Sequence, residues 1–77
     1  MTNETIVTFE DATDTRLGRY NFSYETHIMD FDGYIIASPR ESRAIDTIEW
    51  GINVPIHWEE AESILLNKFY EWKNEHL

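Results

Sequence analysis

The sequence contains no cysteine in its 77 residues. A disulfide bond, a metal site built on thiolates and catalysis by a thiol nucleophile are therefore excluded. A chain of this length forms one domain, residues 1–77, and buries only about 60% of the surface that its unfolded form exposes. Its stability must come largely from three Trp, four Tyr and four Phe, and a dimer would add to it.

Basic residues are also scarce. Six Lys and Arg stand against fifteen Asp and Glu, which gives a formal net charge of −9. This charge repels phosphate backbones and anionic lipid head groups, so we expect no direct binding of nucleic acid or of a membrane surface. With 42% hydrophobic residues, the chain is nevertheless apolar enough to fold.

Long hydrophobic runs are missing, and none approaches the roughly 20 residues of a membrane-spanning helix. The first residues, Met1-Thr2-Asn3-Glu4, lack the basic and apolar stretches of a signal peptide. We therefore expect a cytoplasmic protein. In size, acidity and lack of catalytic groups it is similar to small accessory proteins of bacteria and their viruses.

Catalytic and cofactor-binding patterns are missing as well. The three glycines are isolated from one another, so no Gly-rich phosphate-binding loop exists. The three histidines are far apart, and no serine has the neighbours of a nucleophile. Asp30-Phe31-Asp32-Gly33 resembles the opening of a Ca²⁺ loop, but the later ligands and the closing Glu are missing. We expect no enzyme activity, no metal and no cofactor.

The first half of the chain predicts strands. Residues 4–10 are rich in β-branched side chains, and from Tyr20 to Ile28 apolar and polar side chains alternate, which is typical of a half-buried strand. Asp32-Gly33 lies between two apolar segments and predicts the tight turn of a β-hairpin. Near that turn Met29, Phe31, Tyr34 and Ile36 can share one face, which predicts a bulge or a covered hairpin tip.

The second half predicts helices. Ser38-Pro39-Arg40-Glu41 has the pattern of a capping box, which predicts a short helix over residues 39–50 that ends at Gly51. The competing interpretation is a strand through residues 48–52. Residues 57–76 predict a long helix with an apolar stripe, made of Trp58, Ala61, Leu65, Phe69 and Trp72.

These elements predict an α+β domain. It has a three-stranded antiparallel sheet centred on a β-hairpin, with a short and a long C-terminal helix packed on one face. The alternative is four strands with a single C-terminal helix.

One stretch of the sequence suggests a binding surface. Between Ala44 and Asn67 there is no Lys or Arg, and the acidic residues are Asp46, Glu49, Glu59, Glu60 and Glu62. If the two helices pack together, these carboxylates form an acidic wall that complements a basic surface on another protein. The other interpretation is that this charge serves solubility.

Apolar residues without an obvious core position are candidate anchors for a partner. They are Met29, Phe31, Tyr34, Trp50 and Tyr70. The sequence therefore predicts a small acidic module that docks on a basic protein surface, in a sharper form as a nucleic-acid mimic whose carboxylates imitate phosphates. The alternative is a structural homo-oligomer, such as a homodimer, that buries the apolar hairpin tip.

Overall fold

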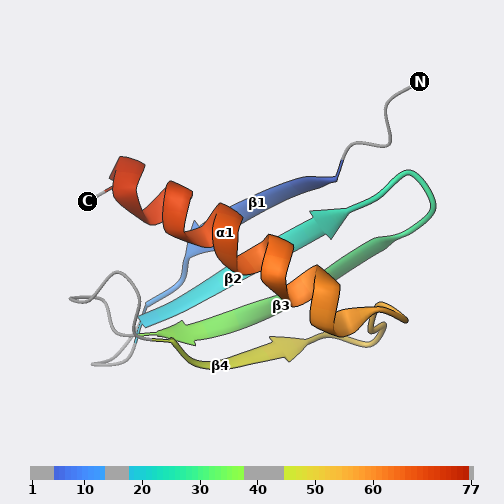
Figure 1. Cartoon of the computed structure of the whole chain (residues 1–77). Coiled ribbons are helices and arrows are strands. Elements are labelled where there is room, and N and C mark those ends of the chain that lie inside the picture. Colours follow the sequence, from blue (N-terminus) through green and yellow to red (C-terminus); the bar gives the residue numbers. More distant parts are fainter. Residues whose placement is uncertain (1–4, 14–17, 38–44, 77) are drawn as a thin grey trace.

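The computed structural model describes residues 5–13, 18–37 and 45–76. Four strands form one antiparallel sheet in the order of the sequence, and one helix crosses a face of that sheet (Figure 1). The elements are β1 (Ile6–Asp11), β2 (Gly18–Glu25), β3 (Asp30–Ala37), β4 (Ile45–Trp50) and α1 (Trp58–His76). The protein is thus an α+β domain with four strands and one C-terminal helix, so the alternative prediction describes it better than three strands with two helices.

The prediction of a short helix over residues 39–50 was wrong where the structure describes that segment. Residues 45–50 form β4, which pairs antiparallel with β3. The predicted capping box lies outside the described residues. The segment Ile45–Trp50 is rich in β-branched and aromatic side chains, and the edge of β3 offers it hydrogen-bond partners and an apolar face. This tertiary pairing explains why residues 45–50 form a strand.

A register shift keeps the large apolar side chains of β4 on one face of the sheet. Ile48 pairs with Ile35, whereas Ile45 pairs with Ala37, so β4 has one residue more than β3 over this stretch. An extra residue of this kind reverses the alternation of side chains beyond it. As a result Ile45, Ile48 and Trp50 all pack against the core.

The β2–β3 turn is Thr26–Met29, and the prediction of a turn at Asp32-Gly33 was wrong. The Thr26 hydroxyl oxygen accepts hydrogen bonds from the N–H groups of Ile28 (3.3 Å) and Met29 (3.0 Å) and donates one to the Met29 carbonyl (2.7 Å). A threonine side chain thus closes the turn, as Ser and Thr do in short turns. Asp32 and Gly33 lie inside β3, and no described glycine has a positive φ.

Gly33 lies in β3 at a point where the neighbouring strands leave no room for a side chain. A Cβ atom there would lie 2.8 Å from the ring of Phe22 and would collide with the backbone oxygen of Glu49. The rings of Phe22 and Trp50, on the two neighbouring strands, meet edge to face with their centroids 5.1 Å apart. The missing side chain leaves the space in which these two rings meet.

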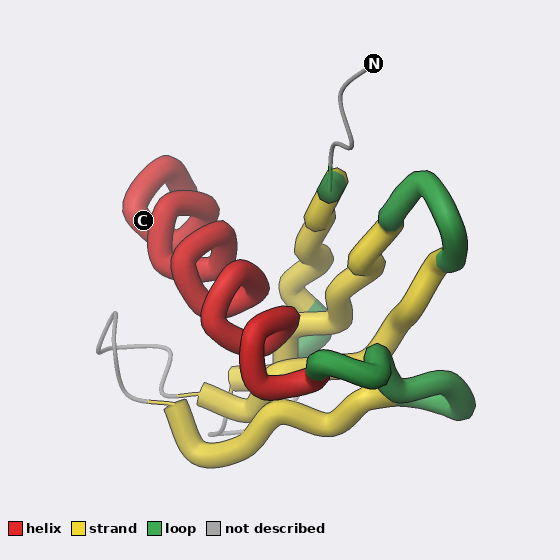
Figure 2. Tube along the Cα trace, turned by 45° about the vertical axis from the view of Figure 1, so that its right-hand side comes forward, coloured by secondary structure: helices red, strands yellow, loops and turns green. Residues whose placement is uncertain are grey.

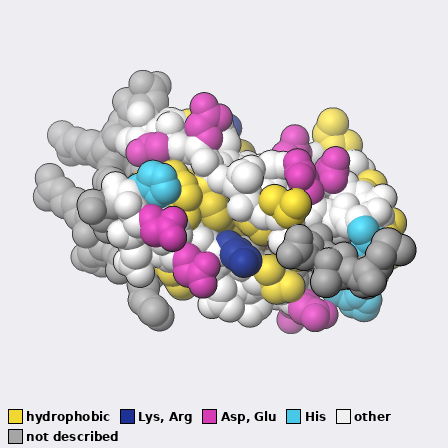
Figure 3. All heavy atoms as spheres, turned by 90° about the horizontal axis from the view of Figure 1, so that it is seen from above, with side chains coloured by type: hydrophobic (Ala, Val, Ile, Leu, Met, Phe, Trp, Pro, Cys, Tyr) yellow, Lys and Arg dark blue, Asp and Glu magenta, His cyan; other side chains and the backbone are white. Residues whose placement is uncertain are grey.

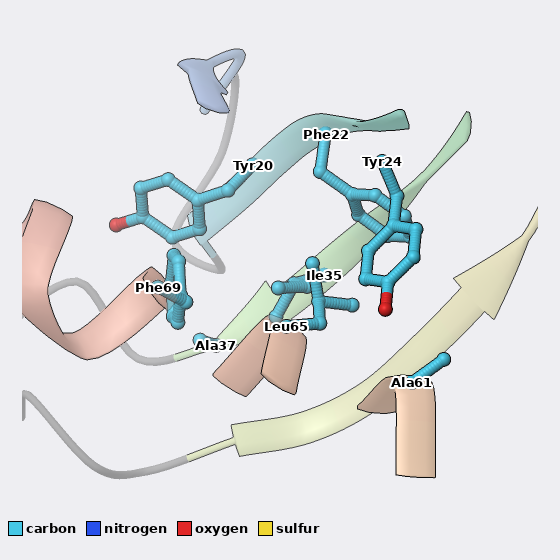
Figure 4. Packing of buried hydrophobic residues seen from close by; sticks show 8 residues of the cluster. All are labelled: Tyr20, Phe22, Tyr24, Ile35, Ala37, Ala61, Leu65 and Phe69. Atoms are coloured by element: carbon cyan, nitrogen blue, oxygen red, sulfur yellow. The ribbon is translucent and has the colours of Figure 1, made fainter. Parts of the chain in front are cut away.

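The core lies between α1 and the sheet. Its buried hydrophobic members are Tyr20, Phe22, Tyr24, Ile35, Ala37, Ala61, Leu65 and Phe69 (Figure 4). The predicted alternation is confirmed from Tyr20 to Glu25, because every second residue of β2 faces the helix and is buried, but the strand ends there and Ile28 lies in the turn. The long helix is confirmed as well, although Trp58 at its first residue remains 46% exposed, so the buried stripe begins at Ala61.

Candidate partner-binding groove

An apolar groove of about 490 Å³ opens at one end of the sheet. The β2–β3 turn, residues 51–57 and the first turns of α1 stand together at this end (Figure 2). The inner lining is supplied by Tyr24 and Ala61, which are buried, and by Phe31 and Ile64, which are half-buried. The sheet and the helix therefore form the base of the groove, and the two loops form its sides.

The sides of the groove carry aliphatic side chains that face solvent. The exposed fractions are 82% for Ile28, 44% for Met29, 100% for Ile52, 53% for Val54 and 91% for Ile56. Single exposed aliphatic residues are common on protein surfaces, but a contiguous group marks an interaction site. This group is the largest apolar feature that the described residues leave uncovered, because it accounts for five of their seven exposed large hydrophobics.

A smaller hollow of about 250 Å³ adjoins the groove and carries acidic side chains. It shares Phe31, Ile52 and Asn53 with the groove, and Asp30 and Asp32 also line it. Both carboxylates are exposed. No Lys or Arg is among the described residues that line either hollow. The site is therefore apolar in the groove and negative in the hollow beside it.

Glu60 brings a further carboxylate to the groove. It lines the groove from the first turn of α1, where the helix dipole favours a negative charge. Burial raises the pKa of the Tyr24 hydroxyl, a hydrogen bond with Thr5 lowers it in part, and the charge of Glu60 makes the smallest contribution, which raises it. Tyr24 consequently stays neutral at physiological pH and keeps a hydroxyl at the base of the groove.

The predicted acidic wall does not form as one surface. Glu49 lies on the face of the sheet turned away from α1, since its neighbours Ile48 and Trp50 face the helix. Glu59 is exposed on the first turn of α1, and α1 lies on the other side of the sheet from Glu49. Glu62 is half-buried and accepts a hydrogen bond of 2.9 Å from the indole nitrogen of Trp50. The wall was predicted from two packed helices, and β4 replaces one of them.

The side chain of Asp46 lies outside what the structure describes. On the face seen from above, Asp and Glu side chains are scattered between hydrophobic ones (Figure 3). Of the acidic residues singled out from the sequence, Glu60 alone is brought to the groove among those whose side chains the structure describes.

The structure separates the candidate anchors. Met29 and Phe31 line the groove, and Phe31 is also in ring contact with Tyr24 and Trp50, at centroid distances of 6.3 and 6.2 Å. Trp50 belongs to the core, because its ring also meets that of Phe22 and its indole nitrogen is hydrogen-bonded. Of these three residues, Met29 and Phe31 therefore line the groove and Trp50 does not.

The other two anchors lie away from the groove. Tyr34 is on the open face of the sheet, where the guanidinium carbon of Arg19 lies 4.2 Å from its ring centroid. Tyr70 is half-buried on α1, with its ring 6.2 Å from that of Phe69. Neither residue lines the groove.

Sequence reasoning missed the aliphatic residues that dominate the groove. Ile52, Val54 and Ile56 lie in a connection, and Ile28 is in a turn that was expected to be part of a strand. One signal could have found them: connecting segments are usually polar, yet every second residue from 52 to 56 is a large aliphatic one. Apolar side chains with no helix or strand to place them in a core are candidates for a binding surface.

The described residues include no group of three or more His, Asp and Glu arranged to hold a metal ion. No helix among them has both the length and the apolar character needed to cross a membrane. Comparison with protein-family models, with curated proteins and with solved structures found no match.

Proposed function

We propose that this chain is a small acidic protein-binding module that docks on a basic surface of a cytoplasmic protein. The groove carries this proposal, because Ile28, Ile52 and Ile56 are each more than four-fifths exposed and lie around one concave site. Removing them from water on binding would supply affinity. The net charge of −9 would favour basic partners and raise the rate of association.

The experiment begins with capture of partners from bacterial lysate by the immobilised chain at low and at high salt. A captured protein is then purified, and its affinity is measured by calorimetry over a series of salt concentrations. The double variant Ile52→Ser/Ile56→Ser should weaken binding about tenfold or more, because it removes apolar contact area from the groove. Ile6→Ser is the matched control, since Ile6 is 51% exposed and lies outside the groove.

Added salt should weaken the same complex, because it screens the attraction between exposed charges. The proposal would be contradicted if the affinity of the purified partner changed neither in the groove variant nor with the salt concentration. A loss of binding in Ile6→Ser as large as in the double variant would show that another surface is used.

Nucleic-acid mimicry is supported by the open face of the sheet, which includes the two carboxylates of the small hollow. Side-chain alternation places five exposed carboxylates there: Glu10, Glu25, Asp30, Asp32 and Glu49. Arg19 is the only basic residue that the described strands add to this face. Competition with duplex DNA for the captured partner tests this form, and a partner that binds DNA and the chain simultaneously would exclude it.

Self-association is the second candidate function, and the exposed turn favours it. Ile28 and Met29 project aliphatic surface at the β2–β3 turn, where two copies could bury it. Light scattering distinguishes a monomer from a dimer, because one chain has a mass of 9.2 kDa and a dimer has twice that mass. A dimer that dissociates in Ile28→Glu would support this function, and a monomer at all concentrations would remove it.

A further inference from the structure

The groove and the hollow beside it differ in chemistry but share one boundary. Ile52 and Asn53 line both of them, as does Phe31. Asp30 and Asp32 are alternate residues of β3 and point to the open face of the sheet, roughly 6.6 Å apart along the strand, whereas the groove lies on the face that α1 covers. Because Ile52 and Asn53 border both hollows, a ligand that fills the groove and continues around Ile52 meets two carboxylates.

Local packing holds the Asp32 carboxylate in the hollow. The backbone N–H of Gly51 donates a hydrogen bond of 2.7 Å to the Asp32 carbonyl oxygen. The Asp32 carboxylate lies directly against Gly51, where any Cβ atom would collide with it. This contact joins β3 to the start of the segment that carries Ile52, so the acidic and apolar parts of the site are linked through the backbone.

We infer that the site binds a partner segment in which a large apolar side chain is followed closely by Arg or Lys. The apolar side chain would occupy the groove, and the cation would lie between Asp30 and Asp32. Arginine suits the hollow best, because its planar guanidinium can donate to two carboxylates at once. This inference rests on the proposed function and specifies the chemistry of its partner.

The charges around the site disfavour other occupants. A second copy would bring another net charge of −9 and the same carboxylates against Asp30, Asp32 and Glu60. A fatty acid or a nucleotide fits the size of the groove, but its anionic group would be repelled by the same three residues. A peptide segment with an apolar and a basic side chain complements both the apolar groove and the acidic hollow.

The test is a selection from a displayed library of random peptides, carried out in parallel on the full chain and on three folded variants. Asp30→Asn/Asp32→Asn removes the charge of the hollow and keeps the shape. Ile52→Ser/Ile56→Ser removes the apolar groove, and Ile6→Ser is the control on the surface outside it. Circular dichroism verifies that each variant is folded.

The wild-type chain and Ile6→Ser should enrich peptides that combine a large apolar residue with a nearby Arg or Lys. The Asn variant should enrich apolar peptides without a preference for basic residues, and the Ser variant should enrich neither. The strongest peptide is then synthesised, together with a version that has Glu in place of its basic residues. The Glu version should bind the wild-type chain at least about tenfold more weakly.

Nuclear magnetic resonance of the ¹⁵N-labelled chain locates the peptide. Shifts should concentrate in residues 28–32 and 51–57. Enriched peptides without a basic residue, shifts centred on Arg19 and Tyr34, or no enrichment at all would overturn the inference. If a captured partner still depends on Ile52 and Ile56 in that case, the proposed function stands and only the specificity is wrong.

Discussion

The two ends of the interface between helix and sheet differ in how they are closed. Near the C-terminus of α1, Phe69 packs on Phe9 and Tyr20 with ring centroids 5.4 and 5.1 Å apart, and Trp72 lies next to them. The hollow left there is only about 60 Å³. At the other end the groove is about 490 Å³ and has exposed aliphatic sides.

This difference has a structural cause. The closed end is built by side chains that the strands and the helix place on facing surfaces, so that each ring meets another. The open end is built by a turn and a connection, and no further layer covers their aliphatic residues. Stability and binding should therefore be separable: substitutions at the closed end should affect folding, and those at the open end should affect the partner.

The largest difference between the ends should come from truncation of large apolar residues. Phe69→Ala should lower the free energy of unfolding by about 3–5 kcal/mol, because Phe69 is fully buried and its removal leaves a cavity. Ile52→Ala should change it by no more than about 0.5 kcal/mol, since Ile52 is fully exposed. Urea unfolding followed by tryptophan fluorescence measures both, and similar losses in the two variants would contradict the comparison.

Next in size is the effect of filling the space over Gly33, between the two ends. Gly33→Ala should destabilise the protein by about 1–3 kcal/mol, because the new methyl group meets the Phe22 ring and the Glu49 backbone. Urea unfolding measures the loss. Adding Phe22→Leu to Gly33→Ala should cost less than the sum of the two single changes if the ring is the obstacle, and additive losses would argue against that contact.

A smaller effect should follow from the hydrogen bond that ties β4 to α1 near the groove. Trp50→Phe removes the donor to Glu62 and should cost about 1–2 kcal/mol in unfolding free energy. Glu62→Gln keeps an acceptor at the same place and should cost less. A larger loss in Glu62→Gln than in Trp50→Phe would show that the carboxylate charge matters more than the bond.

The smallest effect should appear at alkaline pH. Burial raises the pKa of Tyr20 at the closed end, with a smaller contribution from the charge of Asp11, and burial likewise raises the pKa of Tyr24 at the groove. Unfolded tyrosine ionises at about pH 10, so the unfolded state loses its proton first and is stabilised as the pH rises. Stability should therefore be retained below about pH 10 and decline above it.

Tyr20→Phe and Tyr24→Phe should each make this alkaline decline less steep. Urea unfolding at a series of pH values between about 9 and 11 measures the slopes. A slope unchanged in both variants would contradict the attribution to these two hydroxyls. Since Tyr24 also lines the groove, a bound peptide should steepen the decline in the wild type more than in Tyr24→Phe.

Periodic patterns were sufficient for part of the fold. The alternation that starts at Tyr20 placed β2 correctly, and the apolar stripe through Ala61, Leu65 and Phe69 placed α1 correctly. Both patterns reflect the geometry of the element itself, which puts every second or every third to fourth side chain on one face. Such information is local, and no other part of the chain is needed to interpret it.

The candidate site was only partly accessible in the same way. Met29, Phe31 and Glu60 were named from the sequence and do line the groove. The aliphatic residues of the connection were missed, because their significance depends on the turn and the helix that lie beside them. A groove formed by two separate stretches of the chain, residues 24–31 and 52–64, has no signature in either one alone.

The sequence by itself determined an acidic α+β domain with one long C-terminal helix and an aromatic core. Tertiary structure decided the rest. Residues 45–50 form a strand because they pair with β3, and Gly33 lies within β3, next to the rings of Phe22 and Trp50. Tertiary structure also brought the exposed aliphatic residues together with Asp30 and Asp32. These outcomes depend on contacts between residues far apart in the chain, whose free energies outweighed the local preferences for a helix over residues 45–50 and for a tight turn at Asp32-Gly33.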